Sequence, residues 1–525
     1  AEARAIPDSR QVVCTAMAHH SYTAGSIIAL DPSQGEDGPK PITRLTPETR
    51  FPETEGWPEG VFCTPWPLSE DLVLAAYTPE KLAMQGKVQS TNAYGIVLID
   101  SLGGREEIYR DPAMSSVSPM PLQPRPEPVL LSSTLPPPLD EQGQTRPGLL
   151  YIQNAALGRM DFGAPIKALR VNSIIGQPTP SVPHRGAVRQ EIVKRVEGTV
   201  PVNPDGSAFF HVPSGVPIQL QALDEQGMAV MTMRSFIFTQ PGETLSCIGC
   251  HEDRALTPPP RSGNAGAPKA LTPSVNHDYP GGFSYLRSVQ PIFDRHCISC
   301  HGLGQAQPDL RGTPVERPMP DYPGWPGTVR VATSYNELIN RPDMVKIAQR
   351  NVETAVSKPR DYFAHAGKLM PFLLQGHCPA LLADKDAVAT LITWLDLNAQ
   401  YHGDYSFARR EDISADPAGE KALRDAVRER FGEAWAAQPY ACLVNVANPA
   451  QSRVLMAALP AAVGGWGQVA AAAGAFTGRD DPTWLHFRDL VEQSMAPYEP
   501  PAADGTCKQS KCICGSCWVP AQQMK

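Results

Sequence analysis

The sequence lacks a strong excess of charge of either sign. Its 525 residues include 46 Lys and Arg against 54 Asp and Glu, a net charge of -8 that argues against a nucleic-acid partner. It also lacks an obvious membrane span. Residues 454–476 carry no charge, but they include Pro460, several glycines and few large aliphatic side chains. We expect this stretch to be a loop and helix packed within a domain.

The chain also lacks a recognisable signal segment. Residue 1 is Ala, and no positively charged stretch leads into an apolar one, so we expect either a removed signal or an excerpt of a longer chain. Proline, in contrast, is abundant at 55 residues and favours loops, extended connections and edge strands over long helices. The length predicts about three or four domains.

One pentapeptide pattern occurs twice, as Cys247-Ile-Gly-Cys250-His251 and as Cys297-Ile-Ser-Cys300-His301. Cys-x-x-Cys-His is the attachment pattern of c-type haem, in which two thiols bond to the haem and the histidine binds the iron. The competing interpretation is a pair of disulfide loops with incidental histidines. We predict two haem c groups and, because this attachment normally takes place outside the cytoplasm, an extracytoplasmic compartment such as the periplasm.

The fold is predicted to be multidomain α+β, beginning with β structure. Residues 1–120 contain apolar runs that end in turns, at 26–35 and 95–104, and predict a β-rich, propeller-like region that is complete or partial. Residues 121–148 are rich in proline and predict an extended linker.

Residues 149–260 are predicted to form a β-sandwich-like domain that carries the first haem. Alternating apolar residues predict one hairpin over 199–212, with an Asn-Pro-Asp-Gly turn, and a second over 218–230 that turns at 224–227. The first haem motif follows directly, so we expect this sheet structure to support it.

The rest of the chain is predicted to be helical. After a linker over 261–280, residues 281–405 predict a cytochrome c-like domain, because Leu286, Val289 and Phe293 share a helical face that leads into Cys297. A second helix is expected to begin at the cap Asp384. Residues 406–525 predict a helical region with a cysteine-rich tail.

The second haem has several candidate axial ligands. His301 is the expected proximal ligand, and the downstream candidates for the other side are His377, Met370 and His365, with an open position as the remaining alternative. A methionine among apolar neighbours is more often a core residue than a ligand. His296 is expected to face outward.

The first haem has His251 as its expected ligand and candidate catalytic group, and no clear partner nearby in sequence. Cys14, His19 and His20 could bind zinc or line a haem pocket, since thiolates and imidazoles are zinc ligands. Alternatively, they are a satisfied pair of loop histidines and a buried or disulfide-bonded cysteine. We keep both interpretations.

Four cysteines gather at the end of the chain without a histidine: Cys507, Cys512, Cys514 and Cys517. Such a cluster forms disulfides in an oxidising compartment, or binds a metal ion through four thiolates. Attachment of a third haem is the least favoured alternative, because Trp518 stands where the histidine would be.

Several segments together resemble the alpha subunit of hydrazine synthase and its relatives. They include Cys247-Ile-Gly-Cys-His-Glu252, Gly376-His377 and Trp394-Leu-Asp-Leu-Asn398. The others are residues 205–210, 221–228, 233–235, 241–243 and 289–302. The resemblance implies a propeller-containing N-terminal part, a middle domain with one haem and a C-terminal domain with a bis-histidine haem. It favours His377 as the second axial ligand.

The same resemblance implies that the first haem is catalytic and joins nitrogen compounds. It also implies that the motif histidine binds zinc and that a tyrosine four residues later binds the haem iron. Here that later position is Ala255. We therefore carry three functions: a haem-dependent enzyme acting on a small nitrogen compound, a non-catalytic dihaem electron-transfer subunit, and a haem-bearing scaffold. Each would work with other redox subunits or electron carriers in a hetero-oligomer.

Overall fold

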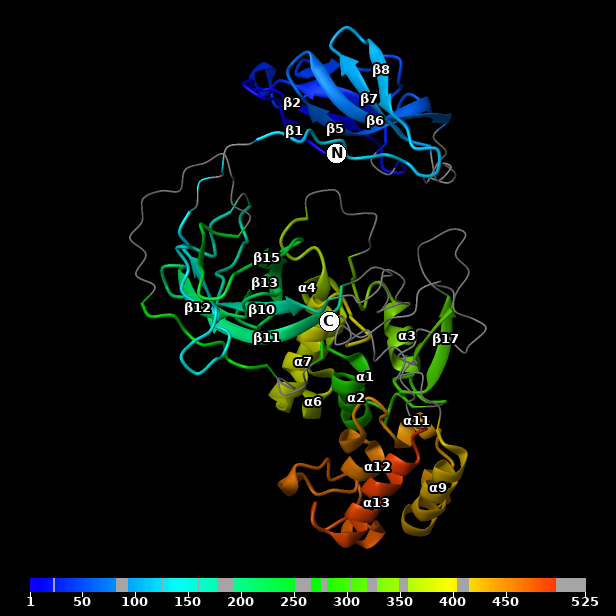
Figure 1. Ribbon diagram of the computed structural model, residues 1–525. Coiled ribbons are helices and arrows are strands. Elements are labelled where there is room, and N and C mark those ends of the chain that lie inside the picture. Colours follow the sequence, from blue (N-terminus) through cyan, green and yellow to red (C-terminus); the bar gives the residue numbers. More distant parts are fainter. Residues whose placement is uncertain are drawn as a thin grey trace. The chain divides into compact units, whose positions relative to one another are not determined.

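The computed structural model describes residues 1–21, 24–81, 93–124, 127, 129, 131–158, 160–176, 192–250, 266–274, 281–302, 304–318, 328–348, 357–403 and 415–496. The chain divides into two compact units, Ala1–Leu131 and Ser132–Lys525 (Figure 1). The fold is mixed α and β, as the sequence predicts.

The first unit consists of two four-stranded antiparallel sheets. One has the order β1 (Arg4–Ala5), β2 (Val12–Ala16), β3 (Ser26–Leu30), β4 (Ile42–Arg44), and the other β5 (Glu59–Pro67), β6 (Leu72–Lys81), β7 (Gly95–Asp100), β8 (Arg105–Tyr109). Their inward side chains form one core that includes Val13, Ile27, Phe62, Val73 and Ile99. Four-stranded sheets are the units of propellers, but the described strands do not close into one.

The second unit begins with two sheets that share a hydrophobic core. A five-stranded sheet has the order β11 (Lys194–Pro201), β10 (Ala168–Ile174), β13 (Pro217–Leu223), β14 (Ala229–Thr232), with β15 (Ile237–Phe238) beside β13. A three-stranded sheet has the order β12 (Ala208–Val212), β9 (Gly148–Ile152), β16 (Thr244–Cys247), and β16 runs parallel to β9. Leu150 and Phe210 from the small sheet pack with Val171 and Leu220 from the large one.

One of the two predicted hairpins is wrong and the other is confirmed. The 199–212 segment makes its turn, where the Gly206 amide donates to the Asn203 carbonyl at 2.9 Å, but β11 pairs with β10 while β12 pairs with β9. The turn therefore carries the chain from one sheet to the other. The 218–230 hairpin forms between β13 and β14, with the Gly227 amide donating to Asp224.

Short helices follow the sheets and enclose a second core. They are α1 (Tyr285–Ser288), α2 (Gln290–His296), α3 (Thr333–Ile339), α4 (Phe363–Ala366), α5 (Leu369–Phe372), the π-helical turn η3 (Leu373–His377), α6 (Pro379–Ala383) and α7 (Lys385–Asp396), with the hairpin β17 (Pro314–Pro318) and β18 (Thr328–Ala332). Asp384 caps α7 as predicted, accepting from the Ala387 amide at 3.1 Å. Tyr285, Phe293, Tyr335 and Trp394 fill the core.

The last described segment forms a third hydrophobic core. It comprises α9 (Pro417–Phe431), α10 (Glu433–Ala436), α11 (Tyr440–Leu443), α12 (Arg453–Met456) and α13 (Pro482–Gln493). The uncharged stretch 454–476 lies here, and its Val454, Leu455 and Phe476 pack in that core. Among the described residues, no helix combines the length and apolar character that crossing a membrane requires.

Polar residues on β10 and β13 join the large sheet to the helical core. Along both strands, alternate side chains enter the sandwich core, and the others (Arg170, Asn172, Gln219, Gln221) are buried on the opposite face. Arg170 Nη1 donates to Asp396 Oδ2 and to Gln221 Oε1, both at 2.9 Å, and Gln221 Nε2 donates to the Asp396 carbonyl. The sheet and α7 are thus fastened through buried hydrogen bonds.

Candidate functional site

The second Cys-x-x-Cys-His motif begins where α2 ends. The Cys297 amide donates to the Phe293 carbonyl at 2.8 Å, which continues the helical pattern. The Cys300 and His301 amides then both donate to the Cys297 carbonyl, at 3.0 and 2.9 Å. This single turn gathers the two thiols and the imidazole, as attachment of one haem requires.

The His301 ring is oriented by a backbone carbonyl. Its Nδ1 lies 3.0 Å from the carbonyl oxygen of Pro308. A carbonyl can only accept, so Nδ1 carries the proton and Nε2 keeps its lone pair free for a metal. This is the arrangement expected of a histidine that binds haem iron.

His377 lies close to this imidazole. The ring centroids of His301 and His377 are 6.0 Å apart, with an angle of 57° between the rings. A metal–imidazole bond of about 2.0 Å, plus about 1.1 Å from the nitrogen to the ring centre, puts two trans imidazoles roughly 6 Å apart. The observed separation therefore fits one iron between the two histidines.

Local backbone geometry delivers His377 to this position. Gly376 has a φ of 100°, which an L-residue rarely adopts, and it ends the helical conformation just before the histidine. The Phe372 ring lies 4.3 Å from the His377 ring, centroid to centroid, and contacts one side of it. The Gly-His pair in the sequence thus combines a conformational requirement with the candidate ligand.

The other sequence candidates for this iron are engaged elsewhere. His365 Nε2 lies 2.9 Å from Asp224 Oδ2, although the angle does not meet that of a hydrogen bond. Met370 is fully buried in the helical core. The expectation that His296 faces outward is wrong: its side chain is 7% exposed and its Nε2 lies 3.3 Å from Asp384 Oδ2. The nearby carboxylate of the α7 cap draws this ring inward.

Burial governs the thiol chemistry of this motif. Burial raises the pKa of Cys297 to about 12, with a smaller contribution from Cys378, so a free thiol here is protonated at neutral pH. Cys300 is exposed. A thioether bond at Cys297 would replace a buried ionisable group with an apolar one.

The first motif lies at the edge of the small sheet. Cys247 ends β16, and Cys247 and Cys250 pack against the sandwich core. The loop after β9 holds the segment: the Gln153 amide donates to Cys247 at 2.9 Å and the Asn154 amide to Ile248 at 3.0 Å. The sheet thus positions the two cysteines of the motif.

Close backbone contact explains the glycine inside that motif. A Cβ at Gly249 would lie 2.3 Å from the Leu157 carbonyl oxygen, and one at Gly158 would lie 2.2 Å from that of Cys250. Neither position has room for a side chain. His251, together with Ala255, lies outside the described residues.

Residues 166–252, which include β10–β16 and the first motif, match the family model of the hydrazine synthase alpha subunit middle domain. Over this segment the chain is similar to that family. A structure of Kuenenia stuttgartiensis hydrazine synthase also matches, with a TM-score of 0.52 and 18% identity, over 77% of this chain and 62% of that chain. At this identity the match shows a shared fold, and it spans less than two thirds of that relative. No curated protein matches.

The three candidate zinc residues near the start of the chain do not form a metal cluster in the described structure. Cys14 is buried in β2, where burial raises its pKa, and His20 contacts the Glu53 carboxylate, which also accepts from the His19 amide. Among described residues, no three His, Cys, Asp or Glu side chains gather in a way that could hold a metal ion. Zinc binding at Cys14, His19 and His20 stays a prediction.

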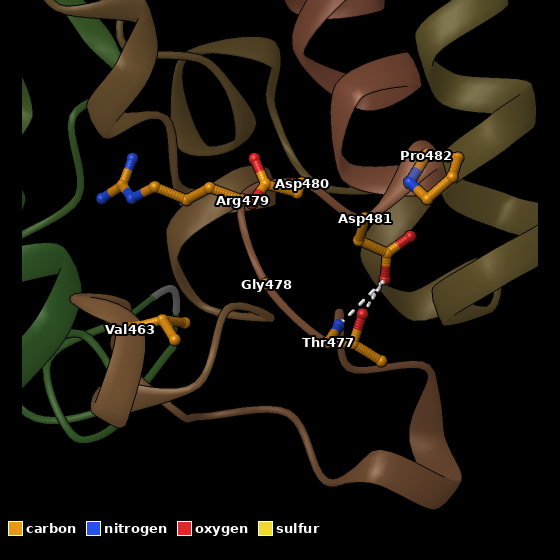
Figure 2. Close-up of a pocket in the computed structure, with 7 residues that line it drawn as sticks. All are labelled: Val463, Thr477, Gly478, Arg479, Asp480, Asp481 and Pro482. Atoms are coloured by element: carbon orange, nitrogen blue, oxygen red, sulfur yellow. Dashed lines mark hydrogen bonds between the residues drawn. The ribbon is translucent and has the colours of Figure 1, made fainter.

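Two further features lie apart from the haem motifs. Cys507, Cys512, Cys514 and Cys517 fall outside the described residues. A surface pocket before α13 is lined by Val463 and residues 477–482, where Asp481 accepts from the Thr477 amide and hydroxyl (Figure 2). It contains no cysteine or histidine, so we assign it no part in haem binding.

The sequence did not reveal the support around His301. The acceptor of its Nδ1 is the backbone carbonyl of Pro308, which has no side-chain signature. A buried chain of polar side chains beside α2, ending at Asp294, was also missed. The available signal was Gln290 and Asp294, two polar residues one turn apart in the helix that leads to Cys297.

Proposed function

We propose that this chain is a dihaem c-type redox protein in which the haem attached at Cys297 and Cys300 relays electrons. The observation that carries the proposal is the pairing of His301 and His377 at 6.0 Å. A haem bound by both imidazoles has no open axial position, which suits electron transfer rather than substrate binding. His301 and His377 would hold the cofactor: the Pro308 carbonyl fixes the His301 tautomer, and Gly376 positions His377.

We further propose that the haem attached at Cys247 and Cys250, with His251, is the candidate catalytic centre for small nitrogen compounds. Support comes from the middle-domain family match, which ends at Glu252 just after this motif. When bound, this haem would supply the redox chemistry, and the chain would supply the tightly packed loop beneath it. The partners we propose are other redox subunits or electron carriers, consistent with the family's description as an alpha subunit, and the compartment is extracytoplasmic.

One sequence observation favours a second function. Ala255 stands where the family resemblance implies an iron-binding tyrosine. A member without that ligand could serve as a non-catalytic electron-transfer subunit, with both irons six-coordinate. The two proposals differ in whether the first haem accepts an added ligand.

Spectroscopy of the purified full chain tests both proposals. Mass spectrometry should show two covalently bound haems, and EPR should show at least one low-spin haem in either case. A second, high-spin signal that shifts on addition of nitric oxide or hydroxylamine supports the enzyme. Two low-spin haems that respond to neither ligand support the electron-transfer subunit.

A histidine variant tests the ligand assignment. H377A should convert the low-spin signal of the relay haem to high spin, because one axial position opens. The matched control is H486N, which changes an exposed histidine on α13 and should leave the spectrum unchanged. An unchanged low-spin signal in H377A would remove His377 from the proposal.

A further inference from the structure

A buried carboxyl group lies on the helix that leads into the second motif. Asp294 is 6% exposed and occupies α2 three residues before Cys297, so the two side chains share one side of the helix. Gln290 Nε2, one turn earlier, donates to Asp294 Oδ1 at 2.8 Å. Neither the haem ligation nor the substrate proposal uses this carboxyl.

Asp294 ends a chain of buried hydrogen bonds. Tyr285 donates its hydroxyl hydrogen to Ser334 Oγ at 2.7 Å, and Ser334 donates to Gln290 Oε1 at 2.5 Å. Gln290 Nε2 also donates to the Leu310 carbonyl at 3.1 Å. The chain fixes the Gln290 amide so that its NH2 group faces the carboxyl.

The groups that interact with the Asp294 charge come from α1, α11 and α12. Tyr285 of α1 and Cys442 of α11 are both uncharged at neutral pH, since burial raises the pKa of each. Arg453 of α12 is the cation that faces Asp294, and the Cys297 thiol also senses the carboxyl charge. Arg453 Nη1 donates to Gln438 Oε1 at 2.5 Å, so this guanidinium group is engaged with another side chain while its charge acts on Asp294.

This environment leaves the charge of Asp294 finely balanced. Burial raises its pKa to about 7, and the amide of Gln290 and the charge of Arg453 oppose that rise. A small change in nearby charge therefore decides whether the carboxyl holds a proton at neutral pH.

We propose that Asp294 takes up a proton when the haem at Cys297 and Cys300 is reduced, so that this relay transfers an electron together with part of a proton. The inference rests on the proposed function. A one-electron donor supplies the electron and the iron is reduced. Solvent supplies the proton, which binds a carboxyl oxygen of Asp294. Reduction removes one positive charge from the haem, and the anionic carboxylate then becomes less favourable.

The test is a redox titration of the holoprotein between pH 5.5 and 8.5. The midpoint potential of the low-spin haem should fall as pH rises near neutrality. The limit of one proton per electron is a tenfold change in equilibrium constant per pH unit, about 59 mV. D294N should abolish most of this slope, while the control E337Q, at a solvent-facing carboxylate of α3 paired with Arg341, should retain it.

A second variant keeps the test informative if D294N does not fold. R453M removes the facing cation and should move the sloping region to higher pH without abolishing it. An infrared band of a protonated carboxyl should appear on reduction of the wild type and be missing in D294N.

Failure to find covalent haem or a low-spin signal would defeat the proposed function. A normal low-spin haem whose potential ignores pH, or a D294N variant that keeps the slope, would overturn this inference alone.

Discussion

The buried ion pair between the sandwich and α7 gives the sharpest prediction about stability. Arg170 and Asp396 have side chains 4% and 0% exposed, and their charged atoms lie 2.9 Å apart. Asp396 also accepts from the Ala229 amide at 2.9 Å and from the Ala364 amide at 3.3 Å. Burial raises the pKa of Asp396, and Arg170 with these two amides opposes that rise. Each charge therefore depends on the other.

D396N should lower the free energy of unfolding by about 3 kcal/mol, because it leaves the Arg170 guanidinium buried with neutral acceptors only. Breaking a buried pair from one side costs about 3–5 kcal/mol, and asparagine keeps part of the hydrogen bonding. The double variant R170M/D396N should cost less than the sum of the singles by at least about 1 kcal/mol, since no unpaired charge remains.

Urea denaturation of the full chain, followed by circular dichroism, measures these changes. Hydrogen exchange should also show protection lost first at Gln221, Ala229 and α7. The matched control is D343N, whose carboxylate pairs at 3.6 Å with Lys368 and is 61% exposed; it should change stability by less than about 1 kcal/mol. If D396N and D343N behaved alike, the reasoning about this junction would be refuted.

Three further predictions concern single residues. G249A should lower the free energy of unfolding by about 1–3 kcal/mol and reduce the yield of haem-loaded protein, because its Cβ would meet the Leu157 carbonyl oxygen. G176A, which has open space around its Cβ, should change neither quantity. N398G should be about 1 kcal/mol more stable than N398A in thermal unfolding, since residue 398 has a φ of 63°. The contribution of Asp294 to stability should fall by up to about 4 kcal/mol from pH 4 to 7, and the difference between wild type and D294N should measure it. The folded pKa of about 7 exceeds the unfolded value, so this contribution is full below pH 4 and lost above 7.

Periodicity and motifs predicted the parts of the structure that depend on local sequence. The strands at Ser26–Leu30 and Gly95–Asp100, the α7 cap and the helix leading to Cys297 all follow from neighbouring residues. The family resemblance added His377, whose role no nearby residue specifies. The predictions from periodicity and motifs and the one from the family resemblance all used residues that lie close together in the sequence.

The errors arose where distant segments decide the outcome. The 199–212 turn looks like a hairpin locally, but β9 and β10 compete for its two strands and separate them. His296 was predicted to face solvent, but its ring lies beside Asp384, which is 88 residues later in the sequence. On the polar face of the large sheet, Arg170 and Gln221 likewise find their partner in Asp396, which lies far along the chain. Sequence alone does not show such long-range partners.

The position of β16 affects the order in which the chain can fold. This strand is the edge of its sheet and pairs Thr244 with Leu149, so the pairing must close a loop of nearly a hundred residues. Contacts this distant in sequence form late. Cys247 and Cys250 should therefore remain accessible while the rest of the sandwich assembles, which leaves a time window for covalent attachment during biogenesis. Pulse labelling of these thiols during refolding would measure that window.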